Sequence, residues 1–229
     1  MPPHAYDVQR ALEVASLTLS ELVCFENADY CVVNKPYDLQ IDGARPATLE
    51  ALLKKLHPDF RELRFCHQLD YATSGLLLLA KSRSAAAAAR DAFDRRMVVK
   101  RYQALIEGVF DGPSVVREPI LEREDGGVEV SAEGKSAETQ FELSEIGECM
   151  GQAVSKLKIS PVTGRRHQIR LHLLYLGHRI VGDMRYGGSE HAPRMMLHAS
   201  ALSIPQLGLP LIERDALFPA LSAYSMKST

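Results

Sequence analysis

The apolar run Leu-Leu-Leu-Leu-Ala at residues 76–80 constrains the fold more than any other stretch of the chain. A short apolar run bounded by turn-prone residues is typical of a strand that is buried on both faces. Before it, Leu69 ends a β-like stretch, Asp70 follows, and Thr73-Ser74-Gly75 favours a turn. The sequence therefore predicts a carboxylate on a short, rigidly held connection, where catalytic groups are often placed. The alternative is that Asp70 only caps the turn.

The remaining segments predict a mixture of helices and strands. Helices are expected where a Ser or Thr cap precedes an amphipathic or alanine-rich run. The first predicted helix is capped by Thr48 and runs to about residue 56, and the second is capped by Ser82 or Ser84 and runs to about residue 95. The third runs from residue 166 to 176 and ends at Gly177. Strands are expected where apolar and polar residues alternate. The predicted strands are residues 22–25, 30–34, 98–108, 115–121, 137–146, 153–159 and 197–204, with a hairpin or loop at 123–135 and an irregular surface tail from residue 205.

Length and composition indicate one globular domain. The chain has 229 residues, of which 46% are hydrophobic and 24% are charged, as in an ordinary protein with a sizeable core. No apolar run approaches the roughly 18 residues of a membrane span. Residues 1–20 lack the basic start and apolar block of a secretory signal. We therefore expect a single α+β domain over residues 1–229, with a largely antiparallel sheet and no membrane association.

The cysteines and histidines predict a reducing compartment and no metal. The chain has four cysteines, at positions 24, 31, 66 and 149, and none forms a Cys-x-x-Cys pair. Three of them lie in apolar, strand-like stretches, where a free thiol behaves as a small hydrophobe. No His, Cys or carboxylate set has a metal-ligand spacing, so we expect His67 and His172 to be hydrogen-bonding packing residues. The expected location is the cytoplasm.

Charge is distributed unevenly although the net charge is only −2. Residues 118–148 hold ten acids and two bases, whereas residues 161–198 hold six arginines and five of the eight histidines against Asp183 and Glu190. A second basic cluster consists of Arg95, Arg96, Lys100 and Arg101. Such a division is expected when one face contacts phosphates and another contacts water. Two ordinary solvated faces explain it equally well.

Three motifs in order give the chain a family resemblance. Residues 67–75 read His-Gln-Leu-Asp-Tyr-Ala-Thr-Ser-Gly, residues 100–104 read Lys-Arg-Tyr-Gln-Ala, and residues 163–172 read Thr-Gly-Arg-Arg-His-Gln-Ile-Arg-Leu-His. These motifs resemble those of the RluA-like pseudouridine synthases, and so do the flanking Val-Val-Asn-Lys-Pro at 32–36 and Leu-His-Ala at 197–199. One such match could arise by chance, whereas the ordered set is specific. The chain departs from the family by having His-Gln-Leu-Asp in place of the usual His-Arg-Leu-Asp.

The resemblance implies a fold and a set of catalytic roles. It covers about residues 20–205 and implies the pseudouridine synthase fold, a central mixed and mostly antiparallel sheet with flanking helices and an active-site cleft. No separate S4-like domain is expected. Asp70 corresponds to the catalytic nucleophile, Tyr102 to the base that removes the C5 proton, and Arg170 to the cation that keeps the nucleophile ionised. No metal or organic cofactor is implied, because the uracil ring itself accepts the electrons.

The implied partner is RNA, either tRNA or rRNA, bound by a monomer. The expected RNA-binding residues are Gln68, Lys100, Arg101, Arg165, Arg166, His167 and Gln168. The target nucleotide must leave its stack to reach an enclosed carboxylate. The family usually has Arg at the position of Gln68, and Gln lacks the planar cation that stacks on bases. This departure concerns the choice of RNA and leaves the nucleophile in place.

Two rival functions stay open at this point. The first is a catalytically silent RNA-binding protein on the same fold, for which Gln68 is the only support and which the three intact catalytic residues oppose. The second is a hydrolase that uses Ser74, but no general-base motif accompanies that serine. Taken alone, Tyr102 would be an ordinary strand aromatic and Arg170 a solvated helix residue. Their order together with Asp70 is what favours the enzyme.

Overall fold

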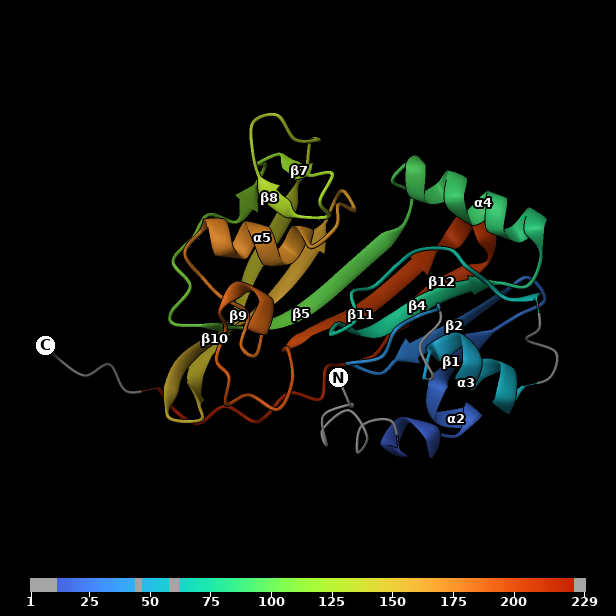
Figure 1. Cartoon of the computed structure of the whole chain (residues 1–229), viewed down its shortest axis with the longest axis horizontal. Coiled ribbons are helices and arrows are strands. Elements are labelled where there is room, and N and C mark those ends of the chain that lie inside the picture. Colours follow the sequence, from blue (N-terminus) through green and yellow to red (C-terminus); the bar gives the residue numbers. More distant parts are fainter. Residues whose placement is uncertain (1–11, 44–46, 58–61, 225–229) are drawn as a thin grey trace, which may run out of the picture. The chain divides into compact units, whose positions relative to one another are not determined.

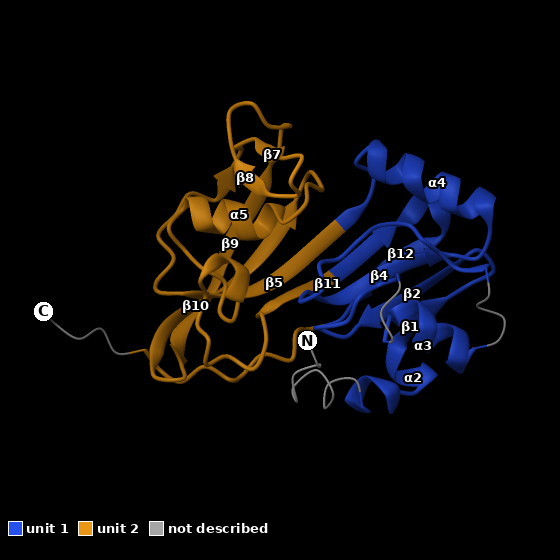
Figure 2. Ribbon diagram, in the orientation of Figure 1, with its two compact units in different colours: residues 1–99, 201–214 blue, residues 100–200, 215–229 orange. Residues whose placement is uncertain are grey.

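The computed structural model describes residues 12–43, 47–57 and 62–224 (Figure 1). The chain forms two compact units, unit 1 with residues 1–99 and 201–214 and unit 2 with residues 100–200 and 215–229 (Figure 2). Both units combine antiparallel strands with helices, which confirms the predicted α+β class. Within the described residues, no helix has the length and apolar character needed to cross a membrane.

Unit 1 is built on β4 (Ser74–Ala80), the strand predicted from the apolar run. All seven of its residues are buried. β2 (Tyr30–Lys35) pairs with it in antiparallel register, from Tyr30 opposite Ala80 to Lys35 opposite Gly75. Three further antiparallel pairs belong to this unit: β1 (Val23–Glu26) with β2, β3 (Arg64–Phe65) with β4, and β12 (Leu209–Glu213) with residues 201–204 of β11 (Leu197–Ile204).

The helices of unit 1 begin at the caps that the sequence predicts. Thr48 Oγ1 accepts a hydrogen bond from the N–H of Ala51 at 3.1 Å, at the start of α3 (Leu49–Leu56). Ser82 Oγ accepts one from the N–H of Ala85 at 3.1 Å, at the start of α4 (Arg83–Asp94). A single turn, α2 (Leu19–Leu22), leads into β1.

The core of unit 1 forms where α4 meets the strands. The helix packs its row of small residues against apolar side chains of β2, β4, β11 and β12, a cluster that includes Val32, Leu76, Leu78, Ala85, Ala89, Ala92, Leu202, Ile204, Leu209 and Ile212. An alanine row allows a helix to approach a strand layer closely. The alternate residues of β4, Leu77 and Leu79, are equally inaccessible to solvent, so β4 is covered on both faces.

Unit 2 has β10 (Gln152–Pro161) between two antiparallel neighbours, β5 (Val99–Glu107) and β9 (Thr139–Cys149). β6 (Val115–Val116) pairs with the far edge of β9. A separate hairpin consists of β7 (Ile120–Glu122) and β8 (Val128–Val130), so the turn and second strand lie in residues 123–135, where a hairpin or loop was expected, and the first strand begins earlier. Its apolar residues pack with Leu171 of α5 (Gln168–Tyr175).

Several predicted boundaries were wrong. The expected strand at 115–121 is broken into β6 and β7, because Pro119 cannot donate to a strand ladder. β3 ends at Phe65, and the turn before β4 lies at residues 71–72, because Ser74 already belongs to the strand. The tail from residue 205 contains β12 as well as the short helical turn η3 (Pro205–Leu207).

Candidate active site

Asp70 lies in unit 1, on the connection between β3 and β4. The N–H of Cys66 donates to the carbonyl of Leu78 at 3.0 Å, which anchors the chain to β4 before the connection begins. The chain returns to the sheet at Ser74. Between these two anchors, the N–H of Thr73 donates to the backbone carbonyl of Asp70 at 3.1 Å and closes a tight turn. The half-buried Asp70 therefore sits on a short connection fixed at both ends, as predicted.

Lys35 anchors the same connection from the end of β2. Its side chain is 0% exposed, and its Nζ donates to the carbonyls of Pro36 (2.9 Å), Leu39 (2.8 Å) and Tyr71 (3.0 Å). The carbonyl of Tyr71 also accepts from the N–H of Leu39 at 3.2 Å. Because Tyr71 directly follows Asp70, one buried cation joins the loop after β2 to the loop that carries the carboxylate. The sequence pointed to Lys35 only through the Asn-Lys-Pro motif.

His67 has the packing role that was predicted for it. Its Nε2 accepts a hydrogen bond from the N–H of Leu78 at 3.0 Å, so the proton of the neutral ring is on Nδ1. Its ring centre lies 5.0 Å from that of Phe93 on α4. The next residues alternate, with Gln68 exposed and Leu69 only 9% exposed. Two residues apart on an extended segment, Gln68 and Asp70 are expected to share a face.

The basic strand β5 places Tyr102 in unit 2. Tyr102 is half-buried and lies opposite Ile159 of β10. Lys100 shares its face, since the two residues are two positions apart on a strand. Lys100 Nζ lies 3.4 Å from the carbonyl of Thr163, and burial lowers the pKa of the Lys100 ammonium group. Arg101 is exposed on the opposite face.

Helix α5 begins at Gln168, two residues later than predicted, because His167 has a left-handed backbone with φ of 56°. A non-glycine residue in this region is uncommon and marks a locally constrained backbone. The Nδ1 atom of His167 lies 2.8 Å from the hydroxyl of Tyr186. At the other end, Gly177 has φ of 82° and its N–H donates to the carbonyl of Leu174 at 2.9 Å, which confirms the predicted stop.

Gln168 is buried in a network that uses both ends of its side-chain amide. Its Nε2 donates to the carbonyl of Glu138 and to the hydroxyl of Thr139, each at 2.9 Å. Its Oε1 accepts from the hydroxyl of Thr163 at 2.6 Å and from the N–H of Arg165 at 3.0 Å. These four bonds satisfy the amide and tie the start of α5 to β9. The geometry gives Gln168 a structural role, and its contact with RNA stays a prediction.

His172 extends this network and has the packing role that was predicted. Its Nε2 lies 2.9 Å from the carbonyl of Glu118, to which it must donate. Its Nδ1 therefore accepts from the hydroxyl of Thr139, also at 2.9 Å. Burial lowers the pKa of His172, because protonation would place a charge in the interior.

We expect the free energy of unfolding to fall as the pH drops below about 6.5, the ordinary pKa of an unfolded histidine. Because the folded pKa of His172 lies lower, the unfolded chain binds more protons between the two values. The stability that neutral His172 contributes is present above the unfolded pKa and is lost as the pH falls through the folded one. Thermal unfolding of the wild type and His172→Gln between about pH 8 and pH 5 checks this. Equal pH slopes in the two proteins would contradict it.

Arg170 is oriented by a buried, bidentate ion pair in unit 2. Its Nε and Nη2 donate to the two carboxylate oxygens of Asp183, both at 2.7 Å, and the two side chains are 7% and 2% exposed. Its guanidinium carbon lies 4.9 Å from the ring centre of Tyr186. Burial raises the pKa of Tyr186, so its phenol stays protonated. No sequence motif assigns a role to Tyr186, and Asp183 is distinguished in the sequence only as one of two acids in a basic segment.

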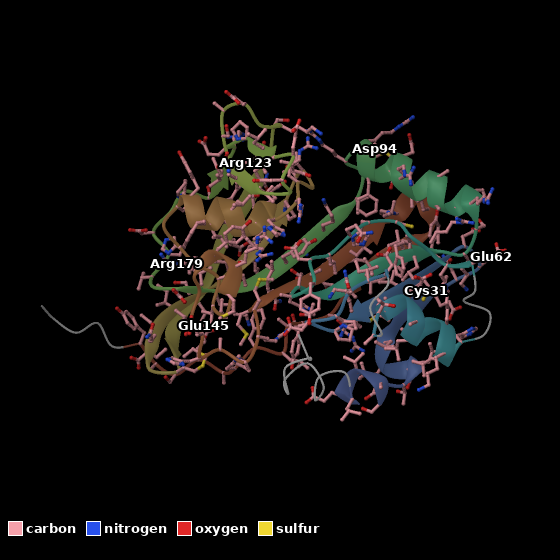
Figure 3. All side chains as sticks on the ribbon, viewed as in Figure 1. Cys31, Glu62, Asp94, Arg123, Glu145 and Arg179 are labelled. Atoms are coloured by element: carbon pink, nitrogen blue, oxygen red, sulfur yellow. The ribbon has the colours of Figure 1, made fainter. Side chains whose placement is uncertain are left out.

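Arg165 and Arg166 flank the start of α5. Arg165 Nε donates to the carbonyl of Ser136 at 3.0 Å, and Arg166 Nη1 donates to the carbonyl of Gly126 at 3.1 Å. Gly126 belongs to the turn of the β7–β8 hairpin, on which Figure 3 labels Arg123. The predicted basic residues of this segment therefore sit around one helix terminus and an adjoining hairpin turn.

The structure brings the predicted site residues together in two groups. Unit 1 holds Asp70 and Gln68 on one connection. Unit 2 holds Arg170 with the Arg165–Gln168 segment at α5, and Tyr102 with Lys100 on β5, next to the turn at Thr163. The pairing of Asp70 with Arg170 and with Tyr102 stays a prediction.

The comparisons with known proteins give the family. Residues 29–175 match the model of the family described as RNA pseudouridylate synthase. The mouse RNA pseudouridylate synthase domain-containing protein 1 is 36% identical over 232 residues, which cover 90% of this chain and 76% of that protein. The ribosomal large subunit pseudouridine synthase C of Pasteurella multocida is 37% identical over 184 residues, which cover 77% of this chain and 55% of that protein.

A solved structure agrees with this assignment. The human RNA pseudouridylate synthase domain containing 1 is similar with a TM-score of 0.77 and 32% identity, over 99% of this chain and 94% of that one. The predicted pseudouridine synthase fold is thereby confirmed. The matched range also contains the three motifs on which the resemblance was based. This chain belongs to the RNA pseudouridylate synthase family, and it is an isomerase.

Proposed function

We propose that this protein converts uridine to pseudouridine in RNA, with Asp70 as nucleophile, Arg170 as its cationic partner and Tyr102 as the base. The observation that carries the proposal is the family match over residues 29–175, which includes all three residues in the order of the family motifs. The reaction breaks the N1–C1′ bond, rotates the uracil and joins C5 to C1′. N1 gains a proton and C5 loses one, so substrate and product are isomers.

The environment of Asp70 suits a nucleophile. Its connection is short and its backbone is anchored by Lys35 through the next residue, Tyr71, which limits the reorganisation needed for attack. Attack at C1′, attack at C6 and removal of the C2′ proton are all reactions that a carboxylate performs. Tyr102 must lose its own proton to act as a base, because a phenol has an ordinary pKa of about 10.

The proposed substrate is RNA of the large ribosomal subunit, with tRNA as the alternative. The support is the name of the bacterial relatives, each a ribosomal large subunit pseudouridine synthase C. The basic residues near the start of α5 and on β5, Arg165, Arg166, Lys100 and Arg101, are proposed to contact phosphates. Backbone contacts of this kind position an RNA without reading its sequence.

The proposed location is the cytoplasm, where thiols stay reduced. All four cysteines of the chain are free. Burial raises the pKa of Cys31 and that of Cys66 to about 12, so both remain protonated thiols at neutral pH. Thiols of this kind act as small apolar side chains in the core.

Release of tritium tests the proposal. Large-subunit rRNA and total tRNA, each labelled with tritium at C5 of uridine, are incubated with the protein, because only loss of the C5 proton sets the label free. Release from either RNA supports the reaction, and the amount released from each identifies the substrate. RNA binding without release from any labelled RNA would favour the silent RNA-binding alternative.

We expect Gln68→Arg to change which RNA is selected more than the rate of chemistry. Gln68 is exposed and lies two residues before Asp70, within reach of the gap that a flipped base leaves. Glutamine stacks poorly, so the wild type should prefer a uridine already unstacked in a loop. Two RNAs with one target uridine, in a loop or in a stem, measure this preference. Gln68→Arg should reduce the preference for the loop RNA over the stem RNA. If both proteins modify the two RNAs at equal rates, Gln68 has no role in base flipping.

A further inference from the structure

We propose that Asp183 is a positioning residue that orients the guanidinium of Arg170 for the isomerisation, with Tyr186 as the second support. This inference rests on the proposed function, in which Arg170 is the partner of the nucleophile. It assigns a task to a carboxylate and a phenol that lie outside the three family motifs. It does not require either residue to touch the RNA.

The ion pair fixes the direction of the guanidinium. A single hydrogen bond would leave the planar group free to rotate, whereas the bonds from Nε and Nη2 to the two oxygens of Asp183, both 2.7 Å, define its plane and its heading. A lysine at position 170 has no such fork and would not be aligned in this way. Burial of both partners keeps water from competing for these bonds.

Tyr186 supports the guanidinium from its face. The Arg170 guanidinium carbon lies 4.9 Å from the centre of the ring, which is within the range of a cation–π contact. The ring is held in turn by its hydroxyl, 2.8 Å from Nδ1 of His167. His167 has a left-handed backbone, with φ of 56°, one residue before α5 begins. The cation is therefore held along one edge by Asp183 and on one face by Tyr186.

Asp183 is itself on a rigid loop. Its N–H donates to the carbonyl of Ile180 at 3.0 Å, and its carbonyl accepts from the N–H groups of Tyr186 (3.1 Å) and Gly188 (2.8 Å). A Cβ at Gly188 would lie 2.3 Å from the carbonyl oxygen of Ile180, so this turn closes only around a glycine. The carboxylate and the tyrosine ring are thus presented by one compact turn of the backbone.

Stability alone does not account for this arrangement. The desolvation of two charges offsets much of the attraction in a buried ion pair, so such pairs are a poor source of folding energy. A cation that must be in place before negative charge develops gains from being fixed beforehand. A misplacement of about 1 Å in a reacting group lowers rates by about 100-fold. The contacts of Arg170 with Asp183 and Tyr186 are what such a fixed cation needs.

The test is a double-mutant cycle on the reaction rate. Two quantities are measured: the single-turnover rate at saturating RNA, and the RNA concentration that gives half of that rate. The proteins compared are the wild type, Asp183→Asn, Arg170→Gln and the double variant. We expect Asp183→Asn to lower the maximal rate by about 10- to 100-fold and to leave the half-saturating RNA concentration within about 2-fold. In the Arg170→Gln background the same change should have no further effect, because Asp183 acts through Arg170.

Glu190→Gln is the matched control. Glu190 is the other acid of the same basic segment, is exposed, and undergoes the same change in charge. It should leave the rate within about 2-fold of the wild type. An equal loss of rate in this control would assign the effect to net charge and overturn the proposal.

The remaining outcomes are equally decisive. Additive losses in the cycle, or a fall in unfolding temperature with an unchanged rate per folded molecule, would show that Asp183 is only structural. An unchanged rate in Arg170→Gln would instead contradict the proposed function. Should Asp183→Asn not fold, Tyr186→Leu removes the face contact and keeps the ion pair. It enters the same cycle with an expected loss of about 3- to 10-fold, coupled to Arg170.

Discussion

Replacing Asp70 with asparagine is expected to abolish pseudouridine formation and to leave the fold and RNA affinity close to those of the wild type. Asparagine has nearly the same shape but is neither an anion nor a nucleophile. The turn should survive, because it is closed by the backbone carbonyl of Asp70. We expect the rate to fall by at least about 10⁴-fold, the scale seen when a catalytic nucleophile is removed. Tritium release, RNA binding and thermal unfolding of the purified variant measure the three properties.

Asp94→Asn is the control for this substitution. Asp94 is an exposed acid at the end of α4 in the same unit, and Figure 3 labels it. It makes the same change in charge and should keep full activity. A rate for Asp70→Asn within about 100-fold of the wild type would exclude Asp70 as the nucleophile. A large fall in the unfolding temperature of Asp70→Asn would attribute the loss of activity to unfolding. Activity and unfolding temperature are therefore measured on one preparation.

The second large effect is expected for Lys35→Met. Methionine has a similar length but cannot donate, so the carbonyls of Pro36, Leu39 and Tyr71 lose a charged partner in the interior. The carbonyl of Tyr71 keeps its hydrogen bond from the N–H of Leu39, whereas those of Pro36 and Leu39 lose the bond from Lys35. Leaving a buried group without a partner costs about 1–3 kcal/mol. We expect a total loss of about 3–5 kcal/mol in the free energy of unfolding, measured by urea denaturation.

Lys55→Met controls for the loss of a positive charge. Lys55 is exposed on α3 of the same unit, and its replacement should change the free energy of unfolding by no more than about 0.5 kcal/mol. Lys35→Met should also reduce activity even where it is folded, because the loop with Asp70 is no longer tied to β2. Equal stability of the two lysine variants would show that the buried cation is not what holds these loops.

Much of the fold was predictable because local signals were strong and agreed with one another. The caps at Thr48 and Ser82 set the first residues of α3 and α4, and the apolar run set β4. β11 was predicted to the residue from its pattern alone. β12 was missed because the surrounding prolines favour an irregular tail. In the structure Pro210 is exposed between two residues that pair with β11, a position where a missing N–H costs little.

The late start of α5 had no signal in the sequence. The residues after Thr163 are compatible with a helix from residue 166. Only tertiary contacts place His167 in the left-handed backbone conformation that delays the helix. Those contacts are the bond to Tyr186 and the buried amide network of Gln168. They depend on segments far away in the chain, and no local rule could anticipate them.

Site residues that belong to a family motif were predictable from the sequence. Residues that act by holding another residue in place were not. The motifs pointed to Asp70 and Arg170, but a lysine is normally assigned to the surface, so the burial of Lys35 was not expected. In the sequence, Asp183 is one of two acids in a segment with six arginines. Its value as a partner for Arg170 follows from geometry that a charge count does not contain.

The division of unit 1 into two stretches of sequence sets an order on its assembly during synthesis. Its core joins Leu76 and Ala89 to Leu209 and Ile212, which leave the ribosome only after the whole of residues 100–200 has been made. At about 5–20 residues per second this delay amounts to roughly 5–20 s. Residues 100–200 of unit 2 are continuous and emerge during that interval. Unit 1 is therefore begun first but completed only after residues 100–200 have been made, and its strands stay incompletely covered while that insertion is translated.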